Sequence, residues 1–417
     1  MRKHINLWAT LTRMKASSKE QARALLSQLP HAAQTFIAVA RRQTDSPLYL
    51  VGGSVRDVFL GRDPRDIDLS TEGDAKAIAT GMQAMLGGEV SCFEAFGTCT
   101  LTLGDWVVDL ATTREETYAH PGALPQVTRS TLDKDLARRD FALNALAVRL
   151  KPTTVDLLDP FGGMSDLKTK TIRTLHPNSF IDDPTRIIRG ARLAGRLGFS
   201  FDDETLAQVP AAVKPDILKQ ISPSRLRAEL ELTLAERRVT PALVQLEALG
   251  ALETMLKTRT DTDLLERLDK LRQEKAAPDE SYLLALLLSV VEDNLLSLLD
   301  TYGWSRRYVR GLERLKEIRA ANDLTQETWT SLRDAEKAVI KAFSDVLKEQ
   351  SETYEALTRE KRLSGKDVLD LGLPEGAEVG AVLMQVARAR HAGEVTTFAE
   401  ELELARTLAQ TYLKSQE

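Results

Sequence analysis

Two aspartates, Asp66 and Asp68, have the type and spacing needed for chemistry on a phosphate group. They lie in the segment Asp66-Ile67-Asp68-Leu69, which alternates as a β-strand does. Side chains alternate between the faces of a strand, so both carboxylates point the same way, where they repel each other unless a cation lies between them. Asp109, within the apolar segment Trp106–Leu110, supplies a third carboxylate, although a strand-end residue facing solvent is its simpler interpretation. The three acids predict a site for phosphoryl transfer assisted by metal ions.

A Gly-Gly turn stands shortly before these acids, between an apolar run and a segment with helical character. Gly52 and Gly53 would let phosphate oxygens approach backbone amides at the start of the helix. Arg56 lies one turn inside that helix, within reach of such a phosphate. The alternatives are a tight strand–helix turn and a salt bridge from Arg56 to Asp57 or Asp63. Combined with the acids, the turn predicts a site for a Mg²⁺-bound nucleoside triphosphate.

Arginines and an aspartate stand together in Arg138-Arg139-Asp140, before Asn144. Two adjacent arginines beside an acid could clamp phosphate and ribose hydroxyl groups. The alternative is a charged helix N-terminus.

A second arginine cluster begins at Asp182-Asp183-Pro184 and continues through Arg186, Arg189 and Arg192. Asp183 suits a helix N-cap and Pro184 the first turn, which would make Asp183 and Arg186 neighbours. An aspartate accepts and an arginine donates hydrogen bonds, so this pair could read the edge of a nucleobase. The alternative is a capped helix with an i,i+3 ion pair and a solvated basic face.

The elements that must position these residues change in character along the chain. Helical periodicity is predicted over Lys19–Leu29 and Ala32–Arg42, followed by a strand at Leu48–Val51. Strands and helices then alternate to about residue 170, whereas nearly everything after Ile181 has the pattern of helices. We expect an α+β fold, with a small mixed sheet first and an all-helical remainder.

Composition narrows the class of protein further. The 417 residues carry a net charge of −5, which argues against non-specific coating of nucleic acid but allows a local basic surface. Cys92 and Cys99, the only cysteines in the sequence, support neither a disulfide framework nor a Cys-based metal site and fit a reducing compartment. The longest apolar stretch, Tyr282–Val291, is too short to span a bilayer. We expect a cytoplasmic protein that does not bind membranes, and we infer no protein partner.

These segments together resemble the class II tRNA nucleotidyltransferase and bacterial poly(A) polymerase family, within the polymerase β-like nucleotidyltransferase superfamily. The resemblance covers nearly the whole chain in order. It rests on VGGSVRDVFLG, RDIDLST, VVDLATTRE, LARRDFALNALA, LLDPFGGMSDLKTKTIRTLHP, SFIDDPTRIIRGARLAGRLGF and ISPSRLRAELELTLA, and weakly on LSGKDVLDLGLPEGAEVGAVL.

The resemblance implies a division into a nucleotidyltransferase head (1–170), a helical neck (171–260) and a helical body and tail (261–417). It also implies roles for individual residues. Catalysis and Mg²⁺ binding would use Asp66 and Asp68, with Asp109 as the third carboxylate. Nucleotide binding would use Gly52, Gly53, Arg56, Arg139, Asp140, Asp183, Arg186, Arg189 and Arg192, of which Asp183 and Arg186 would form a protein template for the base of CTP or ATP.

The implied reaction is addition of C and/or A to the 3′ end of tRNA. One departure from the family pattern is the segment Tyr118–Val127, where many members have a basic loop and this chain has no arginine. Addition of A alone or of CC alone therefore stays open, as does poly(A) synthesis. A catalytically silent RNA-binding protein is a further alternative, against which the intact carboxylates argue.

RNA must also be held, and Ser305–Arg319 is the densest basic segment. Arg306, Arg307 and Arg310 could contact tRNA phosphates. The alternative is a solvated helix face with i,i+4 ion pairs. The sequence beyond His176 contains only His391 as a further histidine, so we expect no metal-dependent phosphatase activity there.

Overall fold

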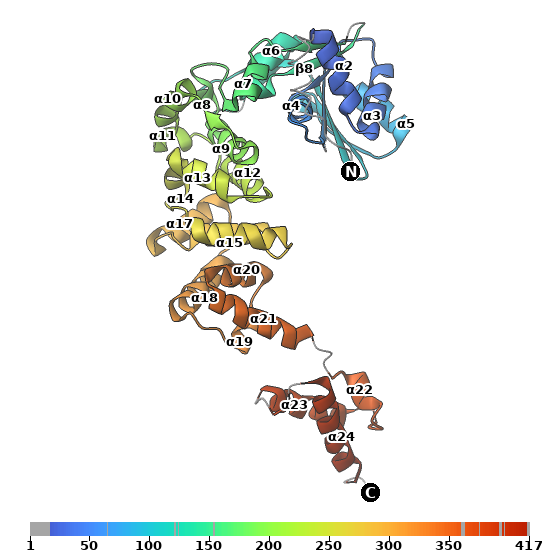
Figure 1. The fold of residues 1–417 in the computed structure, drawn as a ribbon, viewed down its shortest axis with the longest axis vertical. Coiled ribbons are helices and arrows are strands. Elements are labelled where there is room, and N and C mark those ends of the chain that lie inside the picture. Colours follow the sequence, from blue (N-terminus) through green and yellow to red (C-terminus); the bar gives the residue numbers. More distant parts are fainter. Residues whose placement is uncertain are drawn as a thin grey trace. The chain divides into compact units, whose positions relative to one another are not determined.

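The structure, a computed structural model, describes residues 17–414 except 65, 121, 124, 153, 154, 360–362, 375, 392, 393 and 396. The chain forms two compact units (Figure 1). The first comprises the described part of Met1–Leu265 together with Ser289–Arg306, and the second comprises Glu266–Leu288 with the described part of Arg307–Glu417. The expected divisions at residues 170 and 260 stay predictions.

A seven-stranded mixed sheet organises the start of the first unit, with strand order β3-β4-β5-β2-β1-β8-β9. The strands are β1 (Leu48–Val51), β2 (Asp66–Thr71), β3 (Glu89–Phe93), β4 (Thr98–Leu103), β5 (Trp106–Thr112), β8 (Ala147–Lys151) and β9 (Asp156–Leu158). Within this sheet β2 and β5 pair in parallel, and the other neighbours pair antiparallel. The mixed sheet followed by helices confirms the α+β prediction.

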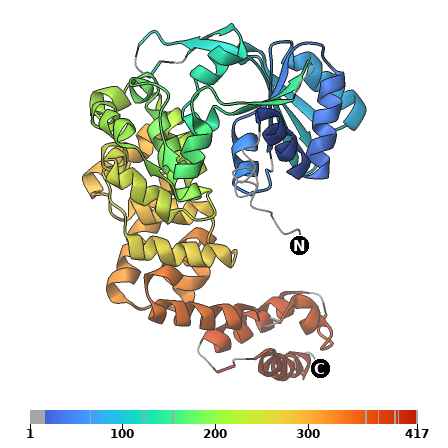
Figure 2. The ribbon, with the colours of Figure 1, turned by 45° about the horizontal axis from the view of Figure 1, so that its top comes forward.

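The two faces of the sheet differ in chemistry because side chains alternate along β2 and β5. Ile67 and Val108 are fully buried, and α5 (Ala75–Leu86) packs against β4 and β5, with α3 (His31–Arg42) beside it (Figure 2). Burial of this apolar face stabilises the sheet by about 25 cal/mol per Å² of apolar surface. The opposite face is left for the acids of the same strands.

Short helices lie before, between and after the strands of this part of the unit. They are α2 (Ser18–Gln28), α4 (Gly53–Phe59), η1 (Glu94–Phe96), α6 (Leu132–Ala137), η2 (Ala142–Asn144) and α7 (Gly163–Thr169). A separate antiparallel pair, β6 (Arg114–Thr117) and β7 (Gln126–Arg129), flanks the loop that begins at Tyr118.

Helices form most of the remainder of the first unit. They are α8 (Ser179–Asp182), α9 (Thr185–Leu197), α10 (Asp203–Ala212), α11 (Pro215–Leu218), α12 (Pro223–Leu234), α13 (Thr240–Ala248), α14 (Ala251–Leu256) and α17 (Glu292–Tyr302), with short parallel strands β10 (Thr171–Ile172) and β11 (Ser200–Phe201). Gly195 of α9 lets α13 approach closely, because a Cβ there would lie 2.6 Å from the backbone nitrogen of Ala242. Helix α9 is thereby fixed along its length.

The second unit is helical throughout its described residues. It contains α16 (Asp279–Leu287), α18 (Arg307–Ala321), α19 (Gln326–Ser331), α20 (Asp334–Phe343), α21 (Asp345–Arg359), α22 (Gly365–Leu369), α23 (Ala377–His391), α24 (Phe398–Lys414) and most of α15 (Thr262–Gln273). Across the described ranges, none of the helices combines the length and apolarity that crossing a bilayer requires.

The cysteines correct one expectation. Cys92 and Cys99 form a disulfide, although the sequence did not support one. The antiparallel register of β3 and β4 places the two residues directly opposite each other, with 4.1 Å between their Cα atoms. Sequence spacing does not show this register, which depends on the hairpin.

Candidate active site

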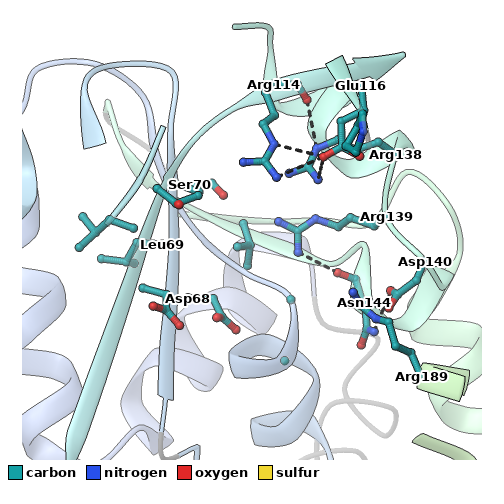
Figure 3. Close-up of a pocket in the computed structure, with 18 of the residues that line it drawn as sticks. Asp68, Leu69, Ser70, Arg114, Glu116, Arg138, Arg139, Asp140, Asn144 and Arg189 are labelled. Atoms are coloured by element: carbon teal, nitrogen blue, oxygen red, sulfur yellow. Dashed lines mark hydrogen bonds and ion pairs between the residues drawn. The ribbon is translucent and has the colours of Figure 1, made fainter. Parts of the chain in front are cut away.

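A cavity of about 640 Å³ opens on the acidic face of the sheet, and Figure 3 shows side chains that line it. The structure brings most of the predicted residues together there. Its lining includes Gly52, Gly53, Arg56, Asp68, Asp109, Arg139, Asp140, Asp183, Arg186 and Arg189. Asp66 and Arg192 are not part of that lining.

The carboxylates are positioned by the parallel strands. Asp68 of β2 lies directly opposite Asp109 of β5, and Asp66 lies two residues earlier on the same face, exposed to solvent. Thr100 donates a hydrogen bond of 2.6 Å to Asp109, and the Ser54 hydroxyl lies 3.1 Å from Asp68 Oδ2. Burial, helped by the negative charge of Asp109, raises the pKa of Asp68 against the opposing effects of Arg139 and Ser54.

This donor set fits a hard divalent cation. Carboxylate oxygens are the ligands that Mg²⁺ prefers, and the pairing of β2 with β5 brings those of Asp68 and Asp109 to the same face of the sheet. Across the described residues, no group of three or more Asp, Glu, His or Cys side chains is already gathered in the manner of a metal centre. Metal binding by Asp66 and Asp68 stays a prediction.

The glycine turn brings its backbone close to the charged groups. Gly52 has a φ of +67°, and a Cβ there would lie 2.9 Å from Arg139 Nη1. A Cβ on Gly53 would lie 3.6 Å from Asp68 Oδ2. Only glycine combines this φ with such a close approach at residue 52.

Arg56 satisfies both interpretations that the sequence left open. It is buried and lines the cavity, and its Nε also forms an ion pair of 2.8 Å with Asp57. Its Nη1 donates to the side-chain oxygen of Asn144 at 2.5 Å. The guanidinium is thus held in a fixed orientation at the cavity wall.

Both terminal nitrogens of the Arg139 guanidinium have partners within the protein, whereas its Nε does not. Nη2 contacts Asp135 at 3.1 Å, and Nη1 donates to the carbonyl of Asn144 at 3.2 Å. Its Nε is buried and has no hydrogen-bond partner within the described part of the chain. A buried donor without a partner is costly, so this atom is suited to an oxygen of a bound ligand.

Sequence reasoning missed Asp135, which anchors both arginines of the cluster. Arg138 reaches it at 2.6 Å, and the side chain of Asp135 is fully buried. Burial opposes ionisation, but Arg139 and Arg138 outweigh it and hold the pKa of Asp135 below its usual value. The sequence did contain a pattern that indicates this role. Asp135 stands three residues before Arg138 and four before Arg139, spacings that place side chains on the same face of a helix.

Asp140 links the sheet region to helix α9. Its Oδ2 forms an ion pair of 2.8 Å with Arg189, and its Oδ1 accepts from Asn144 at 3.0 Å. Burial opposes its ionisation, but Arg189, Asn144, Arg186 and the Phe141 amide together outweigh this effect and lower the pKa of Asp140. The predicted ribose contact would have to use a carboxylate that already has protein partners.

The predicted template residues have different partners from those expected. Arg186 is buried and donates to the hydroxyl of Ser179 and to the carbonyl of Arg138, each at 2.7 Å. Asp183 accepts from Arg225 at 3.0 Å instead of pairing with Arg186. The simple i,i+3 ion pair is therefore not formed.

Helix α9 begins at Thr185, slightly later than predicted, yet Asp183 still accepts from the Thr185 amide at 3.1 Å. Arg192 pairs with Glu229 at 3.2 Å and does not line the cavity, and its support of the template or the triphosphate stays a prediction. Each step of three residues falls about 60° short of a full helical turn, so the arginine stripe rotates away from the site.

The loop side adds further residues that sequence reasoning did not single out. Glu116 accepts from Arg138 at 2.8 Å and from Arg114 at 3.1 Å, and Tyr118 donates to it at 2.9 Å. Burial, with Glu116 adding its charge, raises the pKa of Tyr118. The sequence gave little indication of these contacts, because they depend on the pairing of β6 with β7.

The residues expected to bind RNA lie outside this cavity. Arg306 forms an ion pair with Asp300 at 2.7 Å, and Arg307 forms one with Glu280 at 3.3 Å. Arg310 is exposed on α18. These ion pairs match part of the solvated-face alternative, and the RNA role stays a prediction.

Two family models match the chain. The Poly A polymerase head domain matches residues 48–173, and the probable RNA and SrmB-binding site of polymerase A matches residues 198–261. Both segments lie in the first unit.

Relatives of known activity match more of the chain. An A-adding tRNA nucleotidyltransferase of Geobacter sulfurreducens is 33% identical over 408 residues, covering 88% of this chain and 46% of the relative. A CC-adding tRNA nucleotidyltransferase of Deinococcus radiodurans is 35% identical over 381 residues, covering 89% of this chain and 91% of the relative. The chain spans from 39% to 65% of the lengths of three A-adding relatives.

A solved structure of similar fold is the Thermotoga maritima CCA-adding enzyme complexed with tRNA. It has a TM-score of 0.69 at 26% identity and covers 95% of this chain and 98% of its own. The match over nearly the full length of the Deinococcus relative, with the site residues gathered in one cavity, establishes kinship. The chain belongs to the family of tRNA nucleotidyltransferases and bacterial poly(A) polymerases.

Proposed function

We propose that this protein adds nucleotides from CTP and/or ATP to the 3′ end of tRNA, with release of pyrophosphate. The observation that carries the proposal is one cavity that holds the Asp68–Asp109 pair, the Gly52–Gly53 turn and the unused Nε of Arg139. This set provides cation ligands, close backbone approach and a buried phosphate donor in one place.

Each part has a chemical task. Asp66 and Asp68, with Asp109, would hold Mg²⁺, which when bound supplies charge neutralisation and activates the attacking hydroxyl. Arg139 and the glycine turn would hold the triphosphate and keep it oriented. Thr100 and Ser54 fix the carboxylates in place.

Base selection is assigned to Asp183 and Arg186, which line the same cavity. A carboxylate accepts from the exocyclic amino group of cytosine or adenine, and a guanidinium donates to their ring nitrogen or carbonyl acceptors. Arg186 cannot turn freely, since its two terminal nitrogens are bound to Ser179 and Arg138. Selection therefore rests on preorganised groups.

The segment Tyr118–Val127 favours a partial activity, either A alone or CC alone, over full CCA addition. It contains no arginine, and Tyr118 and Pro125 face the cavity. Relatives named for each partial activity match the chain at similar identity. We propose a cytoplasmic location on the same ground, since tRNA, CTP and ATP are the substrates proposed here.

Primer extension tests the proposal. tRNA ending at the discriminator base, at C or at CC is supplied with CTP, ATP or both, in the presence of Mg²⁺. Extension by one A only on the CC end, or by two C on the discriminator end, identifies the partial activities. Long A tracts on unrelated RNA would indicate poly(A) synthesis, and no incorporation on any tRNA end would overturn the proposal.

A further inference from the structure

Arg225, the third residue of helix α12, lines the cavity and contacts two segments distant from it in sequence, one at Asp183 and one in the loop between β6 and β7. Its Nη2 donates to Asp183 Oδ1 at 3.0 Å, and its Nη1 donates to the carbonyl of Gly122 at 2.9 Å. One planar guanidinium therefore connects the base-selecting aspartate with the loop between β6 and β7. Neither the family models nor the names of the relatives give this residue a role.

Gly122 completes a ring of contacts. Its amide donates to the carbonyl of Asp182 at 3.2 Å, next to the aspartate that Arg225 holds. The ring thus runs from the loop to Asp182, along the backbone to Asp183, through Arg225 and back to the loop. Displacement of any one member changes the position of the other members.

The loop can form this ring only with a glycine at residue 122. Gly122 is buried and has a φ of +71°, a conformation that side chains rarely adopt. A Cβ would lie 3.2 Å from Ile221 Cγ1 and 3.5 Å from the backbone carbon of Gln220. The loop is therefore seated against the segment that leads into α12.

The bond geometry shows why the ring bears on base choice. Asp183 Oδ1 accepts from Arg225 and also from the hydroxyl of Thr185 at 2.6 Å. These donors fix the plane of the carboxylate that the proposed function assigns to the base. A small rotation of that plane would weaken hydrogen bonds that distinguish one base from another, while the triphosphate contacts at Arg139 would be kept.

We propose that Arg225 is a positioning residue for nucleotide choice, coupling the Gly122 loop to the Asp183 carboxylate. This inference rests on the proposed function. Arg225 acts through Asp183 and the loop, and its guanidinium fork is needed because one cation must serve two acceptors in different directions.

The test measures kcat and KM for ATP and for CTP separately, with the full chain and a tRNA end that the wild type extends. Arg225→Ala should lower the ratio of kcat/KM between the preferred and the other nucleotide about tenfold, as expected for one lost charge-assisted hydrogen bond. Arg225→Lys keeps the charge but not the fork, and it should not restore the ratio.

Arg227→Ala is the matched control. Arg227 lies on the same helix, and its Nη1 also donates to backbone carbonyls, those of Tyr302 at 3.2 Å and Gly303 at 2.9 Å. It does not line the cavity. It should leave the nucleotide ratio at the wild-type value. A ratio lowered equally by both alanine variants would show a general effect of losing an arginine from α12 and would overturn the inference.

Gly122→Ala provides a second variant that leaves Arg225 in place. It should lower the ratio in the same direction, and the double variant with Arg225→Ala should lose less than the product of the two single effects. An unchanged ratio in Arg225→Ala, or full recovery in Arg225→Lys, would refute the coupling while the wild type stays active. An inactive wild type would instead defeat the proposed function, and the inference with it.

Discussion

The carboxylate side and the base-selecting side of the cavity are built in different ways. The face on which Asp66, Asp68 and Asp109 lie is set by side-chain alternation along each strand, a local property of the backbone, and the pairing of β2 with β5 then brings Asp68 opposite Asp109. Asp183 and Arg186 are placed by contacts with segments distant in sequence. The carboxylate side should therefore keep its activity when neighbouring residues are substituted, and lose it when one of the acids is removed. The second should shift its selectivity whenever a supporting segment changes.

The largest expected effect tests the carboxylate side. Asp68→Asn keeps the size of the side chain and should lower kcat about a thousandfold, because a neutral amide is a much poorer ligand for a divalent cation. Incorporation is measured by primer extension. Activity within tenfold of the wild type would contradict the assigned role.

The same variant should be at least as stable as the wild type. Burial raises the pKa of Asp68, so its ionised form opposes folding at neutral pH, and the neutral amide removes that cost. Thermal unfolding at pH 7 measures this, and the stability advantage should shrink as the pH falls and the wild-type carboxyl becomes protonated. A large loss of stability in Asp68→Asn would show that the acid has a structural role instead.

The next effect concerns the support of Arg139. Asp135→Asn removes a buried charge that pairs with two arginines and should cost about 3 kcal/mol of unfolding free energy at pH 7. Arg139 and Arg138 hold the folded-state pKa of Asp135 below its ordinary value, so this contribution is complete above the ordinary carboxyl pKa and is lost as the pH falls through the lowered, folded-state pKa. Denaturant unfolding at pH 7 and pH 3 measures the difference.

Asp133→Asn is the control for that experiment. Asp133 lies exposed on the same short helix, α6. Its substitution should change the unfolding free energy by less than about 0.5 kcal/mol. Equal losses in the two variants would mean that the helix, and not the arginine cluster, determines the effect.

A smaller effect is expected on the base-selecting side. Asp183→Ala should reduce discrimination between CTP and ATP by about tenfold to a hundredfold and raise the KM for the preferred nucleotide by less. Competition between labelled CTP and ATP on one tRNA end measures it. Unchanged discrimination would remove Asp183 from the template.

The smallest effect is expected on RNA binding. Arg310→Ala should raise the KM for tRNA about twofold and reduce the dependence of binding on salt by about one counterion. Filter binding over a range of salt concentrations measures the slope. Lys76→Ala, which removes an exposed cation paired with Glu94, should leave that slope unchanged.

The strands, the glycine turn and the shared face of Asp66 and Asp68 could be predicted because each depends on short-range patterns. The register that sets Asp68 opposite Asp109 depends instead on how β2 and β5 pair. The sequence could not show that Arg192 lies outside the cavity lining, because spacing along one helix shows a stripe but not the surface that the stripe meets. Asp135 and Arg225 were missed, since their importance lies in partners brought close by folding. The Cys92–Cys99 disulfide likewise depends on a hairpin register that spacing alone does not reveal.

The parallel pairing of β2 with β5 has a consequence for how this protein acquires activity. Parallel neighbours cannot be joined by a tight turn, and here α5, β3 and β4 intervene in the chain between them. Asp68 and Asp109 therefore meet only after that whole segment has closed back on the sheet, which is a slow, non-local step. A chain released early from synthesis would hold its glycine turn and Asp68 but no complete acid pair. Competence for catalysis should thus appear late and all at once during folding.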